Sequence, residues 1–158
     1  MLSNECVHGL AILSYRQLQN LYCVAMEQAR ILVADDHMVI RTHVRLLLES
    51  RPEWKVCGEA ANGQEAVEKV KELHPDLIVL DISMPVLDGI GAAKIIRTIA
   101  PEVPILILTM HESQHMLQHV QRLGVKGYVP KTELSQKLLD AVSAVLYNQT
   151  FFPTTFVQ

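Results

Sequence analysis

Short apolar runs alternate with longer amphipathic stretches along the chain from residue 29 onward. The short runs are rich in Val, Ile and Leu and have the length and bounding turn residues of β-strands. Two of them, 76–80 and 105–109, are apolar at nearly every position, which is typical of strands covered on both faces. The predicted strands are 29–34, 55–60, 76–80, 105–109 and 126–129.

The stretches that follow these strands place apolar residues at helical spacing. The third and fourth predicted helices lie at about 89–99 and 113–123, and Gly124 ends the fourth as a C′ glycine. Thr132 is the expected N-cap of the last helix. The apolar faces of the first, second and last helices comprise Val44, Leu47 and Leu48; Ala66, Val67, Val70 and Leu73; and Leu134, Leu138, Ala141, Val142 and Val145. Five successive βα units predict a doubly wound α/β fold with a parallel sheet.

Composition fits one folded domain, because 49% of the 158 residues are hydrophobic and 20% are charged. The net charge of −3 argues against a broad basic surface, so DNA binding by this chain alone is not expected. No apolar run approaches the roughly 20 residues of a membrane span, and no secretory signal is visible. We therefore expect a cytoplasmic protein. Its cysteines, Cys6, Cys23 and Cys57, lack CxxC spacing and are interpreted as reduced thiols.

Both ends of the chain depart from the alternation. Residues 1–28 are interpreted as an N-terminal extension of uncertain role, in which Leu18 to Ala25 has the spacing of one short helix face. One hypothesis places the natural start at Met26. Residues 29–148 form the predicted domain. Residues 149–158 hold every Phe of the chain and are interpreted as a tail or the first part of a linker.

Three carboxylates are expected to meet at one edge of the sheet. Asp35 and Asp36 follow the first predicted strand, and Asp81 follows the third. In an open α/β sheet, functional groups gather at the carboxyl ends of the strands where the strand order reverses, which for the order 2-1-3-4-5 lies between strands one and three. Crowded carboxylates raise one another's pKa unless a cation neutralises them. Oxygen ligands without a calcium-binding loop favour Mg²⁺.

Two further polar residues fit the same edge. Thr109 ends the fourth strand, and Lys131 follows the fifth. Acids, a hydroxyl and an ammonium group together suit the transfer of a phosphoryl group to a carboxylate, because metal and Lys neutralise the phosphoryl oxygens while Asp attacks. Taken singly, each residue has a simpler explanation as a helix cap, a solvated charge or a β-former. Their joint placement at four strand ends favours the functional interpretation.

These residues carry a family resemblance. The segments ILVADDH (31–37), DLIVLDISMP (76–85), LDG (87–89), ILT (107–109) and GYVPK (127–131) resemble the receiver domain of two-component response regulators, in the right order over about residues 29–148. Within that family, ADDH (34–37) and GEAANG (58–63) are most similar to receivers of LuxR/NarL-type transcriptional regulators. The resemblance implies a five-stranded sheet of order 2-1-3-4-5 in a flavodoxin-like (CheY-like) three-layer sandwich.

The resemblance also implies a metal site and a phosphoacceptor. Asp81 is then the residue that is phosphorylated by a histidine kinase or phosphotransfer protein. Asp35 and Asp36 hold Mg²⁺ directly or through water, together with Asp81 and the backbone carbonyl of Ser83. His37, beside the acidic pair, is expected to open the first helix rather than to bind metal.

The remaining implied roles concern the switch. Thr109 and Lys131 bond phosphoryl oxygens, and Tyr128 changes rotamer as Thr109 moves. This alters the surface formed by the fourth helix, fifth strand and fifth helix. A homodimer is compatible with the resemblance. Val129–Pro130 is expected to be cis, and the positions of Ser83 and His111 are those at which family members tune loss of the phosphoryl group.

One motif competes with this interpretation. His111-Glu-Ser-Gln-His115 satisfies the H-E-x-x-H pattern of zinc peptidases, and His119 adds a third histidine. Zinc binding by that pattern needs both histidines one turn apart in the same helix. His111 follows a buried strand by only two residues, so it is expected in a loop or first turn, and a peptidase is a remote alternative.

The output of the chain stays open. Phosphatases that form an aspartyl phosphate resemble D-x-D, whereas this chain reads Asp81-Ile-Ser83 and lacks the second acid, so a switch is favoured over an enzyme. Retention of all the polar positions argues against a module that no longer takes phosphate. The chain is interpreted either as the receiver half of a transcription regulator or as a stand-alone, partner-binding receiver.

Overall fold

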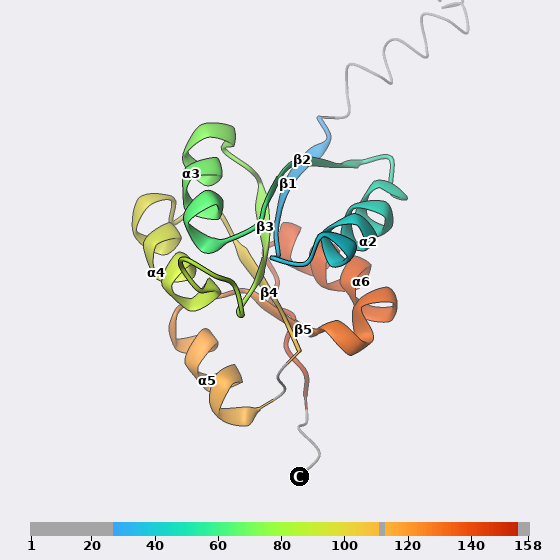
Figure 1. The fold of residues 1–158 in the computed structure, drawn as a ribbon. Helices are drawn as coiled ribbons and strands as arrows, with labels where there is room; N and C mark the ends of the chain where they lie inside the picture. The colour runs from blue at the N-terminus through green and yellow to red at the C-terminus, as the bar shows by residue number, and fades with distance from the viewer. Residues whose placement is uncertain (1–26, 111–112, 155–158) are drawn as a thin grey trace, which may run out of the picture.

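The computed structural model describes residues 27–110 and 113–154, in which strands and helices alternate as the sequence predicts (Figure 1). The short helix expected at Leu18 to Ala25 lies outside these residues, as do His111 and Glu112. No helix in the described ranges is long and apolar enough to cross a membrane. The elements are β1 (Ala29–Ala34), α2 (Met38–Glu49), β2 (Trp54–Ala60), α3 (Gly63–Leu73), β3 (Leu77–Asp81), α4 (Gly89–Ile99), β4 (Ile105–Thr109), α5 (Gln114–Arg122), β5 (Gly127–Pro130), the 3₁₀ turn η1 (Lys131–Glu133) and α6 (Leu134–Leu146).

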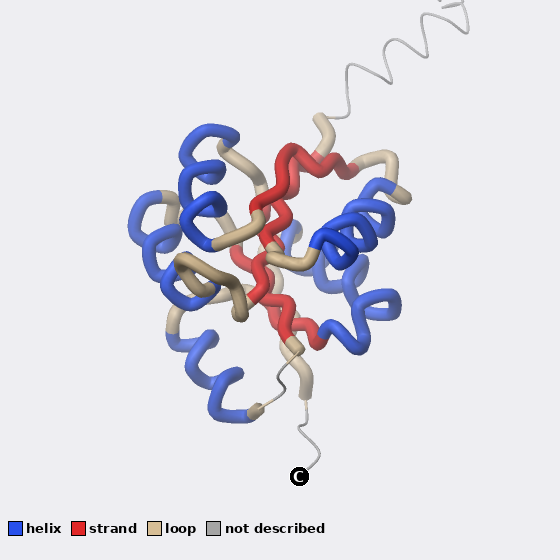
Figure 2. Tube along the Cα trace, in the orientation of Figure 1, coloured by secondary structure: helices blue, strands red, loops and turns tan. Residues whose placement is uncertain are grey.

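The strands form one parallel sheet of order β2-β1-β3-β4-β5, which confirms the predicted fold class (Figure 2). The order reverses between β1 and β3, which pair through Ile31 with Leu77 and Ala34 with Leu80. Because all strands are parallel, their carboxyl ends lie at the same edge of the sheet. Residues that follow β1, β3 and β4 are therefore neighbours although they are far apart in the sequence.

The helices cover the sheet on both faces, with α2 and α6 on one and α3, α4 and α5 on the other (Figure 1). Side chains of β1 alternate between the two layers, since Ile31 and Val33 pack in the core beneath α2 and α6, whereas Leu32 and Ala34 pack in the opposite core. Both β3 and β4 are buried at every position, as expected for central strands. The three-layer arrangement holds the sheet edge rigidly between packed helices.

Local details differ from the sequence prediction at a few points. The last helix begins at Leu134 with Glu133 at its N-cap position, and Thr132 lies in η1, so Thr132 is not the N-cap. Within the described residues no peptide bond is cis, so the expected cis bond at Val129–Pro130 is wrong. The predicted C′ glycine is confirmed, because Gly124 follows α5 with a φ of 79°.

The segment after α6 pairs with the open edge of the sheet. Phe151 forms a parallel bridge with Gly127, in which the Tyr128 amide donates to the Phe151 carbonyl and the Phe151 amide donates to the Lys126 carbonyl. Phe151 packs against the core beneath α2 and α6, and Phe152 packs against the opposite core. The pairing of this segment, which was interpreted from the sequence as a tail or linker, was not predicted.

Candidate functional site

Three polar residues are buried at the carboxyl edge of the sheet. Asp35, Asp81 and Thr109 are each at most 2% exposed. Asp35 follows β1, Asp81 is the last residue of β3 and Thr109 is the last residue of β4. The pairing of β3 with both β1 and β4 brings these strand ends side by side.

Lys131 supplies the positive charge at this edge. It directly follows β5, and its side chain is only 4% exposed. Its ammonium nitrogen lies 2.5 Å from Asp35 Oδ2 and 3.1 Å from Asp81 Oδ2. Removing a charge from water is costly unless it is paired, so the ammonium group offsets part of the cost of burying the two carboxylates. The structure thus brings together three of the residues that the sequence analysis singled out.

The loop between β1 and α2 adds a second acid. Asp35 Oδ1 accepts a hydrogen bond of 2.9 Å from the His37 amide, and Asp36 Oδ1 lies 2.8 Å from His37 Nδ1. His37 is at the N-cap position of α2, as expected, and its ring is exposed. Asp35 Oδ2 and Asp36 Oδ1 are buried, yet neither accepts a hydrogen bond of regular geometry. Their close neighbours are Lys131 Nζ, at 2.5 Å, and His37 Nδ1, at 2.8 Å, so both oxygens contact a nitrogen without a regular hydrogen bond.

The environment of Asp81 raises the pKa of its carboxyl group above the ordinary value of 3.8. Burial is the largest cause, because it disfavours the charged form, and the negative charge of Asp35 acts in the same direction. The charge of Lys131 and a hydrogen bond from the Ser83 amide act against the rise. A further positive charge at the site would favour the ionised form of Asp81.

The donor set suits a hard divalent cation. Ligand atoms of Asp35, Asp36 and His37 lie within 4.8 Å of one another, and the two buried oxygens without a hydrogen bond belong to the two acids. Carboxylate oxygens are the ligands that Mg²⁺ prefers in proteins. Asp81 contacts the same ammonium group as Asp35, so it lies beside this cluster. The residues present thus fit a magnesium-type ion.

Gly89 gives the backbone after β3 a close approach that another residue would prevent. Its amide donates to the Ile82 carbonyl at 2.8 Å, and a Cβ at this position would lie 2.0 Å from the Asp81 carbonyl oxygen. In the same loop the Leu87 amide donates to the Pro85 carbonyl, which makes Val86, with a φ of 68°, the centre of a γ-turn. The chain after Asp81 is therefore folded tightly back on itself.

Two residues predicted to take part in switching lie at or beside β5. Tyr128, on β5, is fully buried in the core beneath α3, α4 and α5, opposite Ile107 of β4. Thr109 lies opposite Pro130 in the same pair of strands. The side chain of Tyr128 is therefore inside the molecule, on the strand next to the one that ends in Thr109.

Two charged residues behind the acidic loop, Arg41 and Glu59, were not predicted from the sequence. Arg41 of α2 donates a hydrogen bond of 2.7 Å from Nη1 to the Asp35 carbonyl oxygen and one of 3.2 Å from Nε to Glu59 Oε2. Glu59 lies on β2. One signal was available in the sequence, namely the carboxylate of Glu59 within a predicted strand. No local pattern, however, pairs Glu59 with Arg41, which lies 18 positions earlier.

The competing zinc motif does not gather a site in the described residues. His115 and His119 lie on α5, which begins at Gln114. Across residues 27–110 and 113–154, the group of potential metal ligands found is the one at Asp35, Asp36 and His37. The zinc peptidase alternative is therefore unsupported.

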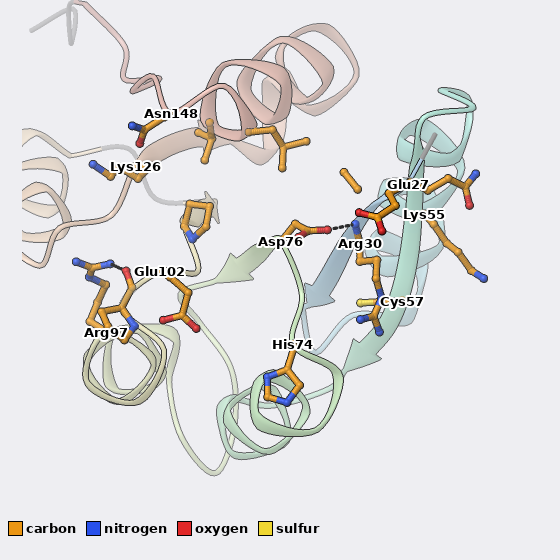
Figure 3. Close-up of a pocket in the computed structure, with 16 residues that line it drawn as sticks. Glu27, Arg30, Lys55, Cys57, His74, Asp76, Arg97, Glu102, Lys126 and Asn148 are labelled. Atoms are coloured by element: carbon orange, nitrogen blue, oxygen red, sulfur yellow. Dashed lines mark hydrogen bonds between the residues drawn. The ribbon is translucent and has the colours of Figure 1, made fainter. Parts of the chain in front are cut away.

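A large open cavity of about 1270 Å³ lies at the opposite edge of the sheet, where the strands begin (Figure 3). Arg30, Lys55, Cys57 and Asp76 line one side of it, and Arg97 is among the residues on the other. None of the predicted site residues lines this cavity. Burial of several charged groups together, rather than the size of a hollow, marks the carboxyl edge as the candidate site.

Comparison with known proteins identifies the class. Residues 31–143 match the family described as the response regulator receiver domain, which is most of the chain. The chain belongs to this family of two-component signalling proteins. A crystal structure of a LuxR-family two-component response regulator from Aurantimonas sp. SI85-9A1 superposes with a TM-score of 0.76 at 35% identity, covering 79% of this chain and 89% of that one.

Two curated relatives show different outputs. The chain is 41% identical over 123 residues to the oxygen regulatory protein NreC of Staphylococcus haemolyticus, covering 77% of this chain and 57% of NreC. It is 45% identical over 107 residues to a protein-glutamate methylesterase/protein-glutamine glutaminase of Methanosarcina mazei, covering 66% of this chain and 29% of that protein. The chain thus spans little more than half of one relative and less than a third of the other.

Proposed function

We propose that this chain is a phosphorylation-controlled switch whose phosphoacceptor is Asp81. The observation that supports the proposal best is the contact of the buried Lys131 ammonium group with both Asp81 and Asp35. A buried lysine between two carboxylates supplies the charge that a phosphoryl group needs when it is added to one of them. The donor would be a histidine kinase or a phosphotransfer protein, because the receiver family works with such partners.

The proposed transfer needs few groups. An Asp81 carboxylate oxygen attacks the phosphorus of the donor's phosphohistidine, the new O–P bond forms as the N–P bond breaks, and the imidazole nitrogen keeps the electron pair. Asp35, Asp36, Asp81 and the Ser83 carbonyl would hold Mg²⁺, which when bound supplies positive charge to the phosphoryl oxygens. Lys131 neutralises another oxygen in the same way.

The proposed response passes through Thr109 and Tyr128. A phosphoryl oxygen on Asp81 attracts the Thr109 hydroxyl, and the movement of Thr109 changes the space around Tyr128 on the neighbouring strand. The surface that changes is formed by α5, β5 and α6. We infer that this chain acts as a switch rather than as an enzyme, in the cytoplasm.

Transcription control is the output that we favour. Support comes from NreC and the LuxR-family regulator, each of which is 35% or more identical to this chain. DNA binding by the described part is not proposed, because the chain carries a net charge of −3. A homodimer is the assembly expected of a receiver that controls a paired output. A stand-alone receiver that binds a protein partner is the alternative.

Intact-mass measurement after exposure to acetyl phosphate and Mg²⁺ tests the proposal. We expect one phosphoryl adduct on the wild-type chain and none on Asp81→Asn. Asp76→Asn is the matched control, because Asp76 lies at the opposite edge of the sheet, where it accepts a hydrogen bond from the Arg30 amide. An adduct of unchanged amount on Asp81→Asn would show that another residue is the acceptor.

A further inference from the structure

Arg41 connects the acidic loop to the body of the sheet. Its guanidinium group donates to the Asp35 carbonyl oxygen at 2.7 Å and to Glu59 Oε2 at 3.2 Å, and the side chain is 15% exposed. Glu59 lies on β2 opposite Val33 of β1, two residues before Asp35. The two hydrogen bonds therefore tie the loop to a position on a rigid paired strand.

Fixing the Asp35 carbonyl has a consequence for the next residue. This carbonyl belongs to the planar peptide group that joins Asp35 to Asp36, so holding the oxygen sets the orientation of that group and the direction in which Asp36 leaves it. The Asp35 amide is fixed as well, by a 3.1 Å hydrogen bond to the Ala60 carbonyl. The loop is thus held at both peptide groups of Asp35, although its two acids repel each other.

Glu59 also neutralises the positive charge that Arg41 brings close to the acidic loop. A guanidinium group close to a cation site would repel the cation, and Glu59 compensates that charge through its contact with Arg41. Its second oxygen, Oε1, lies 2.7 Å from Nη2 of Arg45, one turn further along α2. Arg45 shares Glu59 with Arg41, but among the described residues it makes no hydrogen bond or ion pair with the acidic loop.

We propose that Arg41, held by Glu59, is a positioning residue that keeps Asp35 and Asp36 arranged for Mg²⁺. This inference deepens the proposed function and rests on it. Arg41 acts from behind the loop through the Asp35 carbonyl, so it is not a ligand and touches no reacting atom. Removing partners of this kind around a metal site typically lowers metal affinity by about 10- to 100-fold.

The test compares Arg41→Met with Arg45→Met. Both changes remove one arginine of α2 that contacts Glu59, but only the first removes the bond to Asp35. The dissociation constant of Mg²⁺ is obtained from the rise in melting temperature with Mg²⁺ concentration, which needs no phosphoryl transfer. We expect Arg41→Met to raise this constant about tenfold or more. Arg45→Met is expected to leave it within about twofold of wild type.

A second variant separates charge from packing. Glu59→Gln keeps an acceptor for Arg41 but removes the compensating charge, so we expect weaker Mg²⁺ binding, with a smaller deficit at high salt. An Arg41→Met variant that melts earlier without Mg²⁺ but has the wild-type dissociation constant would make Arg41 merely structural and overturn the inference. If Arg41→Met does not fold, an unchanged constant in Glu59→Gln at low salt overturns it. A wild-type chain that Mg²⁺ does not stabilise would instead contradict the metal site of the proposed function.

Discussion

The two edges of the sheet differ in how far their charged side chains are buried. At the amino edge, charged side chains surround a wide cavity, and the polar contacts there are ordinary ones, such as Arg97 donating to the Pro101 carbonyl and the Arg30 amide donating to Asp76 (Figure 3). At the carboxyl edge, two acids and one lysine are packed together almost out of contact with water.

The comparison indicates that buried charge marks a candidate functional site better than an open cavity does. Solvated charges around an open cavity cost little to maintain and can be exchanged freely. Buried carboxylates that share a single ammonium group are costly to maintain, because one positive charge compensates two negative ones. Ionisable groups in such costly environments cluster at functional sites, which is why the carboxyl edge is the candidate site.

The largest expected effect comes from removing the lysine at the carboxyl edge. Lys131→Met leaves Asp35 and Asp81 buried without their cation, so we expect the free energy of unfolding to fall by about 3–5 kcal/mol. Lys55→Met, at the amino edge, removes an exposed charge and is expected to change it by less than about 0.5 kcal/mol. Urea denaturation of both variants measures the contrast, and equal losses would mean that the two edges do not differ.

The second contrast uses glycines near the two edges. Gly89→Ala places a Cβ against the Asp81 backbone, which cannot yield without moving the site, and we expect a loss of about 3 kcal/mol or more. Gly124→Ala only forces an alanine into a left-handed conformation near the Arg97 side chain, at a cost of about 1 kcal/mol. Thermal unfolding would measure both; a Gly89→Ala variant as stable as Gly124→Ala would show that the loop after β3 adapts easily.

The third contrast concerns backbone strain. Val86 has a φ of 68°, which a β-branched residue rarely adopts, and its side chain is 84% exposed. Val86→Gly should therefore stabilise the chain by about 1 kcal/mol, because glycine adopts this conformation without strain. His74, at the amino edge with a φ of 46°, is the matched position, and His74→Gly is expected to gain about half as much. Destabilisation by Val86→Gly in urea denaturation would contradict strain at that turn.

The smallest expected effect is a pH dependence at Asp81. Its pKa is raised in the folded chain, so the folded state binds the proton more tightly than the unfolded state, and ionisation costs stability as the pH rises from the ordinary value of 3.8 through the folded pKa. Lys131 offsets part of that cost. Without Mg²⁺, Asp81→Asn should be more stable than wild type at pH 7, and the gain should shrink towards pH 3.

Chemical denaturation across that pH range is the measurement, with Asp76→Asn as the control at the other edge. A gain for Asp81→Asn that stays the same from pH 7 down to pH 3 would mean that ionisation of Asp81 is not its origin.

The parts of the site that the sequence predicted are those set by strand ends. Asp35, Asp81 and Thr109 each follow or end a run of buried apolar residues, so a local pattern and the geometry of a parallel sheet were sufficient to bring them together. Lys131 could be predicted in the same way, because it follows the last strand. The order of the sheet came partly from the family resemblance.

The parts that the sequence did not predict depend on contacts between distant elements. The bonds of Arg41 to Asp35 and Glu59 follow from how α2 lies against β2, which no local pattern specifies. The turn at Val86 opposes the preference of its own residue type. Thr132 has the side chain of an N-cap, but the chain forms a 3₁₀ turn there before α6 begins.

The bridge between Phe151 and Gly127 has a consequence for the direction of the chain. β5 would otherwise end the sheet with unpaired backbone groups, which invite another molecule to add a strand, and the bridge protects part of that border. Because the bridge is parallel, residues 151–154 run the same way as β5, and at residue 154 the backbone departs from the end of the sheet that bears the buried acids. The described chain therefore leaves the sheet at the edge that carries Asp35, Asp81 and Lys131, so a change in the charge of that edge acts on the side of the molecule from which the chain continues.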